Sequence, residues 1–70
     1  MKGKVIAVNN STCKIKVLNE NRNVSVIEIL DDLPEVGDIL EGSLESLGGE
    51  MLFNLTKQTS LDVFIDDILI

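Results

Sequence analysis

Few side chains of this chain could carry out covalent or acid–base chemistry. There is no histidine, so no imidazole can act as a general base near neutral pH, and Ser–His and Cys–His nucleophiles are excluded. Neighbouring residues of a strand point to opposite faces, which separates adjacent carboxylates, and loop carboxylates are usually solvated. We therefore expect a non-enzymatic protein with no catalytic residues. The carboxylate pairs concerned are Asp31-Asp32, Asp66-Asp67 and Glu41 with Glu45.

Two further features could bind a metal or react covalently, and each has a simpler explanation. Cys13 is the only cysteine, and we expect it to be a small buried hydrophobic residue on the same strand face as Ile15 and Val17. The neighbouring lysines would project from the other face and leave the thiol unactivated. The acidic loop 31–38 lacks the alternating ligands and the terminal bidentate glutamate of a calcium loop. The sequence thus predicts no metal site and no cofactor.

Charge is divided sharply along the chain. Residues 1–18 carry four lysines and no acid, whereas residues 19–70 carry all 12 acids with only Arg22 and Lys57, so charges of +4 and −10 sum to the net −6. Opposite potentials on different strands guide which partners a small domain meets. Two sets of residues are therefore candidate interaction surfaces. The basic set is Lys2, Lys4, Lys14 and Lys16, and the acidic set is Glu41, Glu45, Asp62 and Asp66.

Alternation of apolar and polar residues predicts strands rather than helices. Because both faces of the segment 24–30 are largely apolar, we expect that strand to be buried on both sides. The segment 62–70 has an alternative interpretation as a short amphipathic helix. The expected strands are 2–8, 13–19, 24–30, 39–47, 50–56 and 61–66.

The first two strands are expected to form a hairpin around residues 9–12, which are rich in turn-forming residues. A register that sets Val5 opposite Val17 and Ala7 opposite Ile15 separates the lysines from the apolar residues, and a register shifted by two residues gives the same two faces.

The fourth and fifth strands are expected to form a second hairpin. Gly48-Gly49 predicts a two-residue turn of the primed kind, which would set Leu44 opposite Phe53 on an apolar face. Before this hairpin, Pro34 and Gly37 predict a turn or a short helical link over residues 31–38.

Six short strands in one domain, residues 1–70, predict an all-β fold: a five- to six-stranded antiparallel barrel or a strongly curled meander. Closure suits so short a chain because it removes exposed sheet edges. The opening strand Lys2-Gly3-Lys4-Val5-Ile6 and the segment Glu35-Val36-Gly37-Asp38-Ile39-Leu40-Glu41-Gly42 resemble OB-fold and SH3-like small barrels. The resemblance implies the architecture alone.

Two families with small barrels differ from this chain at their functional positions. Cold-shock-type RNA-binding barrels carry exposed aromatic and basic residues on the central strands, and this chain has neither there. The hydrogenase-maturation chaperones carry an N-terminal Met-Cys and a Gly-Asp-Tyr-Val step, where this chain has Lys2 and Ile39. The resemblance therefore names no specific family.

Apolar residues in the second half of the chain exceed what a small core needs. Exposed together, they would form a patch of the size typical of interaction sites, or they would cap one end of the barrel. We expect a protein-interaction module that self-associates or binds another protein. The residues are Leu47, Leu52, Phe64, Ile68, Leu69 and Ile70.

The alternative function is nucleic-acid binding through the lysine-rich hairpin. Single-strand binders combine basic grooves with stacking aromatics, but this chain has no Trp or Tyr and its net charge repels a polyanion. The apolar run at the start is too short for a secretory signal, and no stretch is long enough to span a membrane. We therefore expect a cytosolic protein without a membrane partner.

Overall fold

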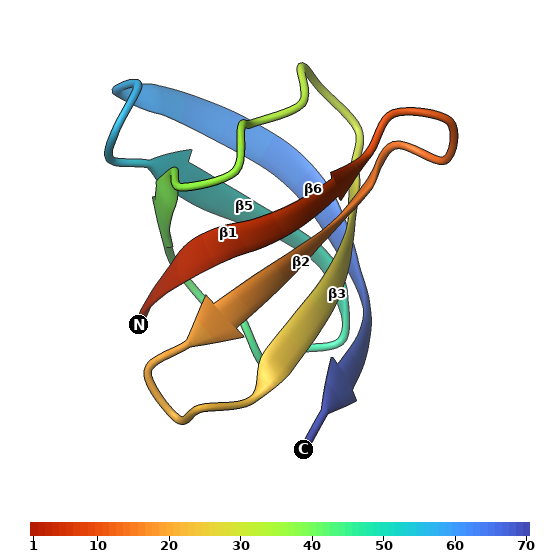
Figure 1. Cartoon of the computed structure of the whole chain (residues 1–70), viewed down its shortest axis with the longest axis vertical. Coiled ribbons are helices and arrows are strands. Elements are labelled where there is room, and N and C mark those ends of the chain that lie inside the picture. Colours follow the sequence, from red (N-terminus) through yellow and green to blue (C-terminus); the bar gives the residue numbers. More distant parts are fainter.

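The chain folds into six strands, which a computed structural model describes over all residues, 1–70 (Figure 1). They close into one antiparallel barrel in the order β1-β2-β3-β6-β5-β4. The expected all-β small barrel, of OB/SH3-like architecture, is confirmed. No helix long and apolar enough to cross a membrane is present. The strands are β1 (Lys2–Asn9), β2 (Lys14–Asn19), β3 (Val24–Ile29), β4 (Ile39–Glu41), β5 (Gly48–Asn54) and β6 (Thr59–Leu69).

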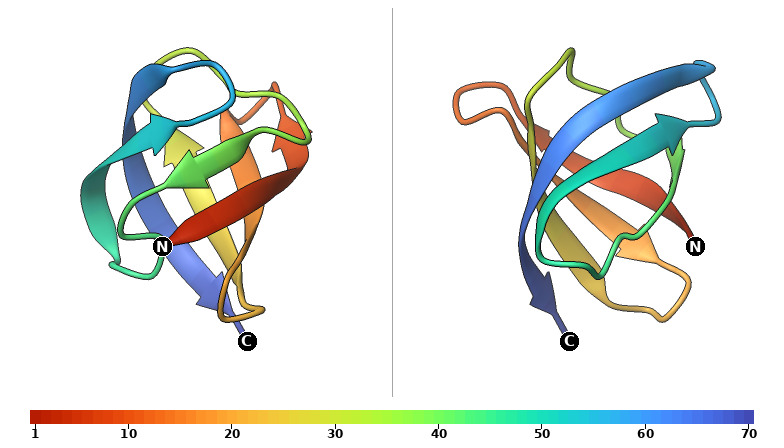
Figure 2. Two further views of the ribbon diagram at one scale, coloured as in Figure 1. Left: turned by 90° about the vertical axis from the view of Figure 1, so that its left-hand side faces the viewer. Right: turned by 180° about the vertical axis from the view of Figure 1, so that it is seen from behind.

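Two three-stranded meanders build the barrel. After β3 the chain crosses over residues 30–38 to place β4 beside β1, and β6 then returns beside β3 (Figure 2). The loops 20–23 and 42–47 and the C-terminus lie at one end, and the loops 10–13, 30–38 and 55–58 lie at the other (Figure 1). The pairing of β3 with β6 brings the second and the last strand of the chain onto one outer surface, because β3 lies between them.

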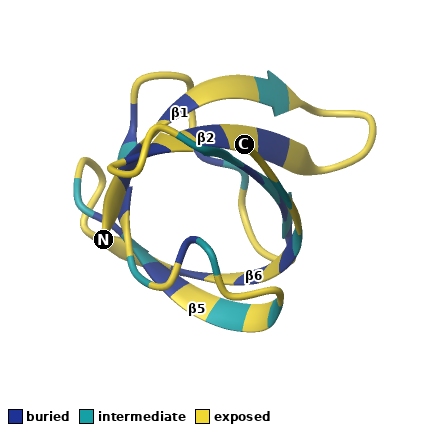
Figure 3. Cartoon of the chain, turned by 90° about the horizontal axis from the view of Figure 1, so that it is seen from below, coloured by how far each residue is buried: buried dark blue, intermediate teal, exposed yellow.

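The core is filled by aliphatic side chains that alternate along the strands with exposed ones (Figure 3). Fully burying one such side chain contributes about 1.5–3 kcal/mol, so this cluster is the main stabilising element of a small domain. Gly3 belongs to the same packing, because a Cβ there would lie 2.5 Å from Val17 Cγ1. The core residues are Val5, Ile15, Val17, Ile27, Ile29, Leu40, Leu44, Leu52, Leu61, Val63 and Ile65.

The first hairpin keeps the expected register only up to Val5, which pairs with Val17. A β-bulge at Ile6 then shifts the ladder, so Ala7 pairs with Lys16 and Val8 pairs with Ile15. The expected pairing of Ala7 with Ile15 is therefore wrong. The bulge leaves two consecutive residues exposed and turns the larger Val8, rather than Ala7, onto the core.

The expected turn at Gly48-Gly49 is also wrong. Both glycines are the first residues of β5 and pair with Ile65 and Phe64 of β6. β4 ends at Glu41. The chain leaves the ladder at Gly42, whose φ of +147° few other residues adopt, and turns over residues 42–47.

Leu44 consequently lies in this loop rather than opposite Phe53, which pairs with Glu41 and Ser60. Its side chain is fully buried and closes one end of the barrel. Ser25 Oγ, buried on β3, donates to Leu44 O at 2.7 Å and anchors the loop across the barrel end.

Two further expectations, on Cys13 and on β3, need correction, and the structure decides two alternatives. Cys13 is exposed, because it occupies a left-handed position (φ 56°) in the β1–β2 turn that aims it away from the core. The strand expected over 61–66 is confirmed, and the alternative helix over 62–70 is wrong, since β6 runs as a strand to Leu69. A turn within residues 31–38 is also confirmed, at Val36-Gly37, where Asp38 N donates to Glu35 O at 3.0 Å, and its alternative, a short helical link, is wrong. The outer residues of β3 are half-exposed rather than buried.

Candidate functional site

The outer surface of β2, β3 and β6 carries side chains aligned in rows across the three strands. Leu18 pairs with Val24, and Val24 pairs with Leu69, which gives one aliphatic row. Lys16 pairs with Val26, and Val26 pairs with Asp67, which gives a second row beside it. We call this surface the β2–β3–β6 face, and its residues are Lys16, Leu18, Val24, Val26, Asp67 and Leu69.

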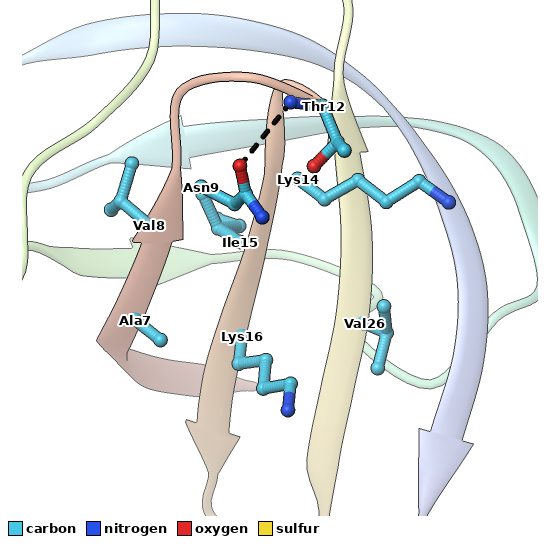
Figure 4. Close-up of a pocket in the computed structure, with 8 residues that line it drawn as sticks. All are labelled: Ala7, Val8, Asn9, Thr12, Lys14, Ile15, Lys16 and Val26. Atoms are coloured by element: carbon cyan, nitrogen blue, oxygen red, sulfur yellow. Dashed lines mark hydrogen bonds between the residues drawn. The ribbon is translucent and has the colours of Figure 1, made fainter.

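The aliphatic row of the β2–β3–β6 face is accessible to a partner. Leu18 is 43% exposed and Leu69 is 45% exposed, and Val24 between them is half-buried. Figure 4 shows Ala7, Lys16 and Val26 side by side on β1, β2 and β3, on the side that faces away from the core. The barrel interior is already filled by the core cluster, so Leu18, Val24 and Leu69 are not needed to complete it.

Charge on this surface runs from basic on β2 to acidic on β6. Lys14 Nζ lies 3.2 Å from Asp66 Oδ2, and this oxygen is buried with no hydrogen bond, so the ion pair is its only polar partner. Lys16 and Asp67 are both exposed, and neither forms an ion pair within the chain. Two opposite charges without an ion-pair partner therefore lie on either side of Val26, and the only hydrogen bond to Asp67 is the one that its Oδ1 accepts from the backbone N–H of Ile68 at 2.8 Å.

The four predicted lysines all point outward, but they do not form one groove. Lys2 lies opposite Glu41 in the β1–β4 ladder, and Lys14 is held by Asp66. Lys4 and Lys16 are exposed without an ion pair. An open hollow of about 420 Å³ lies over the β1–β2 hairpin, where Lys14 and Lys16 line it together with residues such as Val8 and Val26 (Figure 4).

The four predicted acids are distributed over two strands, β4 and β6, and the 42–47 loop. Glu41 lies opposite Lys2 and Phe53, and Asp62 lies opposite Met51. Asp66 is taken by Lys14. Glu45 Oε2 accepts hydrogen bonds from Asn19 and Asn23, and Glu45 Oε1 accepts one from Asn21. No single acidic face results.

The asparagines around Glu45 stabilise its charged form. The hydrogen bond from Asn23 is the strongest influence and lowers the pKa of Glu45, which partial burial opposes and the bonds from Asn19 and Asn21 reinforce. Asn19 Oδ1 in turn accepts from the backbone N–H of Asn21 and Asn23. The cluster ties the β2–β3 turn to the 42–47 loop and uses the Glu45 carboxylate for this purpose.

The predicted apolar patch is also divided. Leu52 is a core residue, and Ile68 packs half-buried against the core. Leu47, Phe64 and Ile70 are exposed, but Phe64 lies opposite Gly49 and Glu28, away from the aliphatic row. Of the predicted set, Leu69 lies in the aliphatic row, and Phe64 lies on the same outer surface in the row beyond Asp67, with Lys14 and Glu28.

Sequence reasoning missed Leu18, Val24, Val26 and Asp67 as surface residues of interest. The available signal was that Leu18 shares the outward face of its strand with Lys14 and Lys16. For Val24 and Val26, the signal was that both faces of the segment 24–30 are largely apolar. The inner face of this strand packs in the core, so the valines of its outer face are not needed there.

A buried carboxylate lies at the end of the barrel that carries the 30–38 loop and the β5–β6 turn. Asp38 is 4% exposed, and its Oδ2 accepts from Glu35 N (3.0 Å), Asn54 Nδ2 (2.9 Å) and Lys57 Nζ (2.7 Å). Burial raises the pKa of Asp38, but the hydrogen bonds from Lys57, Glu35 and Asn54 outweigh it, so the pKa lies below its ordinary value. Lys57 also pairs with Glu35 at 2.9 Å. This cluster joins the 30–38 loop to the β5–β6 turn.

The chain shows no group of three or more Cys, Asp or Glu side chains arranged to hold a metal ion. No family model matches the chain, and comparisons with curated proteins and with solved structures give no match. The function must therefore be inferred from the surface of the barrel itself.

Proposed function

We propose that the protein is a non-enzymatic interaction module that self-associates. The observation that supports this most directly is the aliphatic row of Leu18, Val24 and Leu69 on the outside of a barrel with a complete core. Single exposed aliphatic residues are ordinary on protein surfaces, but an aligned aliphatic row beside a row that carries charges of opposite sign is typical of a contact surface.

Covering this row is favourable in free energy. Each 100 Å² of apolar surface removed from water contributes about 2.5 kcal/mol before the entropic costs of association. The turn at 20–23 and the C-terminus lie past the ends of β2, β3 and β6 (Figure 1).

The test measures molar mass by sedimentation equilibrium over a wide range of protein concentration. We expect mass to rise with concentration, and Leu18→Asp to lower the association constant by about tenfold or more, because it buries a charge in the contact. Met51→Asp is the matched control, since Met51 is 62% exposed on β5, away from the β2–β3–β6 face. A wild-type protein that stays monomeric at the highest concentration would contradict self-association.

Nucleic-acid binding is the second candidate, and it is favoured by two exposed lysines without an ion pair, Lys16 beside the open hollow and Lys4 elsewhere on β1. Lys14 is less available, because it is paired with Asp66. Fluorescence anisotropy with a labelled single-stranded oligonucleotide at low salt tests this function. Binding that Lys14→Glu with Lys16→Glu abolishes would support it, and no binding at low salt would exclude it, since electrostatic affinity is greatest there.

A cytosolic location remains a prediction. It agrees with an exposed Cys13 that has no disulfide partner, because disulfides are characteristic of oxidising compartments.

A further inference from the structure

We infer that a second copy of the chain docks on the β2–β3–β6 face about a two-fold axis that runs along β3, so that Lys16 of each copy meets Asp67 of the other. This inference rests on the proposed self-association and specifies its surface and symmetry. Homodimers most often have two-fold symmetry, and such an interface must be complementary to itself.

The order of side chains across the strands selects the direction of the axis. From β2 to β6 the second row reads Lys16, Val26, Asp67, which is basic, apolar and acidic. A two-fold axis parallel to the strands reverses this order in the facing copy, so each lysine lies opposite an aspartate. An axis across the strands would keep the order and set lysine against lysine, which like-charge repulsion disfavours.

The position of the axis over β3 follows from the same rows. With the axis there, β2 of one copy faces β6 of the other, so Leu18 meets Leu69 in the aliphatic row. Val24 and Val26 lie on the axis and meet their own copies. Apolar side chains then meet apolar ones throughout the centre of the contact, and the charges lie at its sides. Moving the axis between β2 and β3 would instead set Lys16 against Val26.

The two charges that the dimer needs are free in the single chain. Lys16 and Asp67 are separated by β3, so their backbones lie about 10 Å apart, two strand spacings. Neither forms an ion pair within the chain, whereas the neighbouring Lys14 and Asp66 are already paired at 3.2 Å. The internal pair thus leaves Lys16 and Asp67 available for the partner.

The surface of the molecule limits the strength of this dimer. An interface of standard size buries about 800 Å² on each partner, which would be about one fifth of the 4043 Å² surface. The outer face of a barrel is convex, so two copies touch mainly through the three strands named here. We therefore expect a weak dimer, with a dissociation constant in the micromolar range or above.

A charge-swap experiment tests this geometry. We expect Lys16→Glu and Asp67→Lys each to weaken self-association by about tenfold or more, because each places two like-charge pairs in the symmetric contact. Mixing the two variants in equal amounts should restore association, since the glutamate introduced in one variant then meets the lysine introduced in the other. The double variant should associate on its own, and sedimentation equilibrium at low salt measures all four samples.

The controls change the same charges elsewhere. Lys2→Glu and Asp62→Lys alter the net charge equally, but Lys2 lies on β1 and Asp62 lies at the far end of β6. We expect neither to weaken association more than about twofold. Recovery in the mixture also shows that both single variants are folded, which circular dichroism checks independently.

The outcomes separate this inference from the proposed function. Restored association in the mixture supports the dimer. Single variants that associate as well as the wild-type protein, or a mixture that does not recover, overturn this geometry while self-association stands. A wild-type protein that is monomeric throughout overturns both.

Discussion

Two regions of the barrel use charge in opposite ways. At one end, Asp38 is buried and its Oδ2 is surrounded by three donors. On the β2–β3–β6 face, Lys16 and Asp67 are exposed and have no ion-pair partner within the chain. A charged group whose hydrogen-bond partners all come from its own chain stabilises the fold and is not available to bind another molecule. A charge left free beside aliphatic side chains is available for recognition.

The largest expected effect comes from breaking the buried cluster. Asp38→Ala should lower the free energy of unfolding by about 2–3 kcal/mol, because it leaves the Asn54 amide, on a residue that is 1% exposed, without its acceptor. The loss is limited by Lys57, whose side chain is 40% exposed and can be rehydrated. Urea unfolding measures it, with Asp62→Ala as the control at an exposed carboxylate. Equal stabilities of the two variants would contradict a structural role for Asp38.

The pH dependence of stability sharpens the same contrast. Asp38 has a pKa below its ordinary value of 3.8 in the folded chain, so the folded state binds the proton less readily than the unfolded state. Its contribution is therefore present above pH 3.8 and is lost as pH falls through the folded pKa. We expect Asp38→Asn to flatten the acid limb of stability measured by urea unfolding between neutral and acidic pH. An acid limb of unchanged steepness would show that Asp38 does not supply it.

At basic pH the change of stability with pH has the opposite sign. Hydrogen bonds from Lys57 to Asp38 and Glu35 raise the pKa of Lys57 above its ordinary value of 10.5. Its contribution is fully present below pH 10.5 and is lost as pH rises through the folded pKa. The Asp38 cluster thus stabilises the fold throughout the neutral range.

Local alternation in the sequence was enough to predict six strands and much of the core, although the strand expected over 39–47 ends at Glu41. Ile15 and Val17 are buried between exposed lysines, as the pattern of β2 requires. It could not predict the bulge at Ile6, because Ile6, Ala7 and Val8 are all apolar and either register buries one of them. The Gly48-Gly49 pair led to a wrong turn prediction because two consecutive glycines are typical of a tight turn. The chain turns instead at Gly42, where a Cβ would lie 2.6 Å from Leu52 Cδ2.

The candidate face was less predictable because its rows depend on long-range pairing. The sequence placed Lys16 and Leu18 on the outward side of their strand, and this is where they lie. Nothing local indicates that β3 pairs with β6, so Val24 could not be joined to Leu69 or Val26 to Asp67. The bulge that makes Asp66 an extra residue in that ladder also decides which aspartate joins the row, and it depends on the curvature of the closed barrel.

The smallest expected effect concerns Glu28, which lies on β3 beyond Val26 and therefore close to the inferred two-fold axis. In the dimer it would approach its own copy at the edge of the contact, and this is the one like-charge meeting that the geometry creates. Glu28 forms no ion pair within the chain, because the opposing Lys14 is paired with Asp66. Glu28→Gln should therefore strengthen self-association by about twofold at low salt, with less effect at high salt. Sedimentation equilibrium measures it, and weaker association of this variant would place the axis elsewhere than over β3.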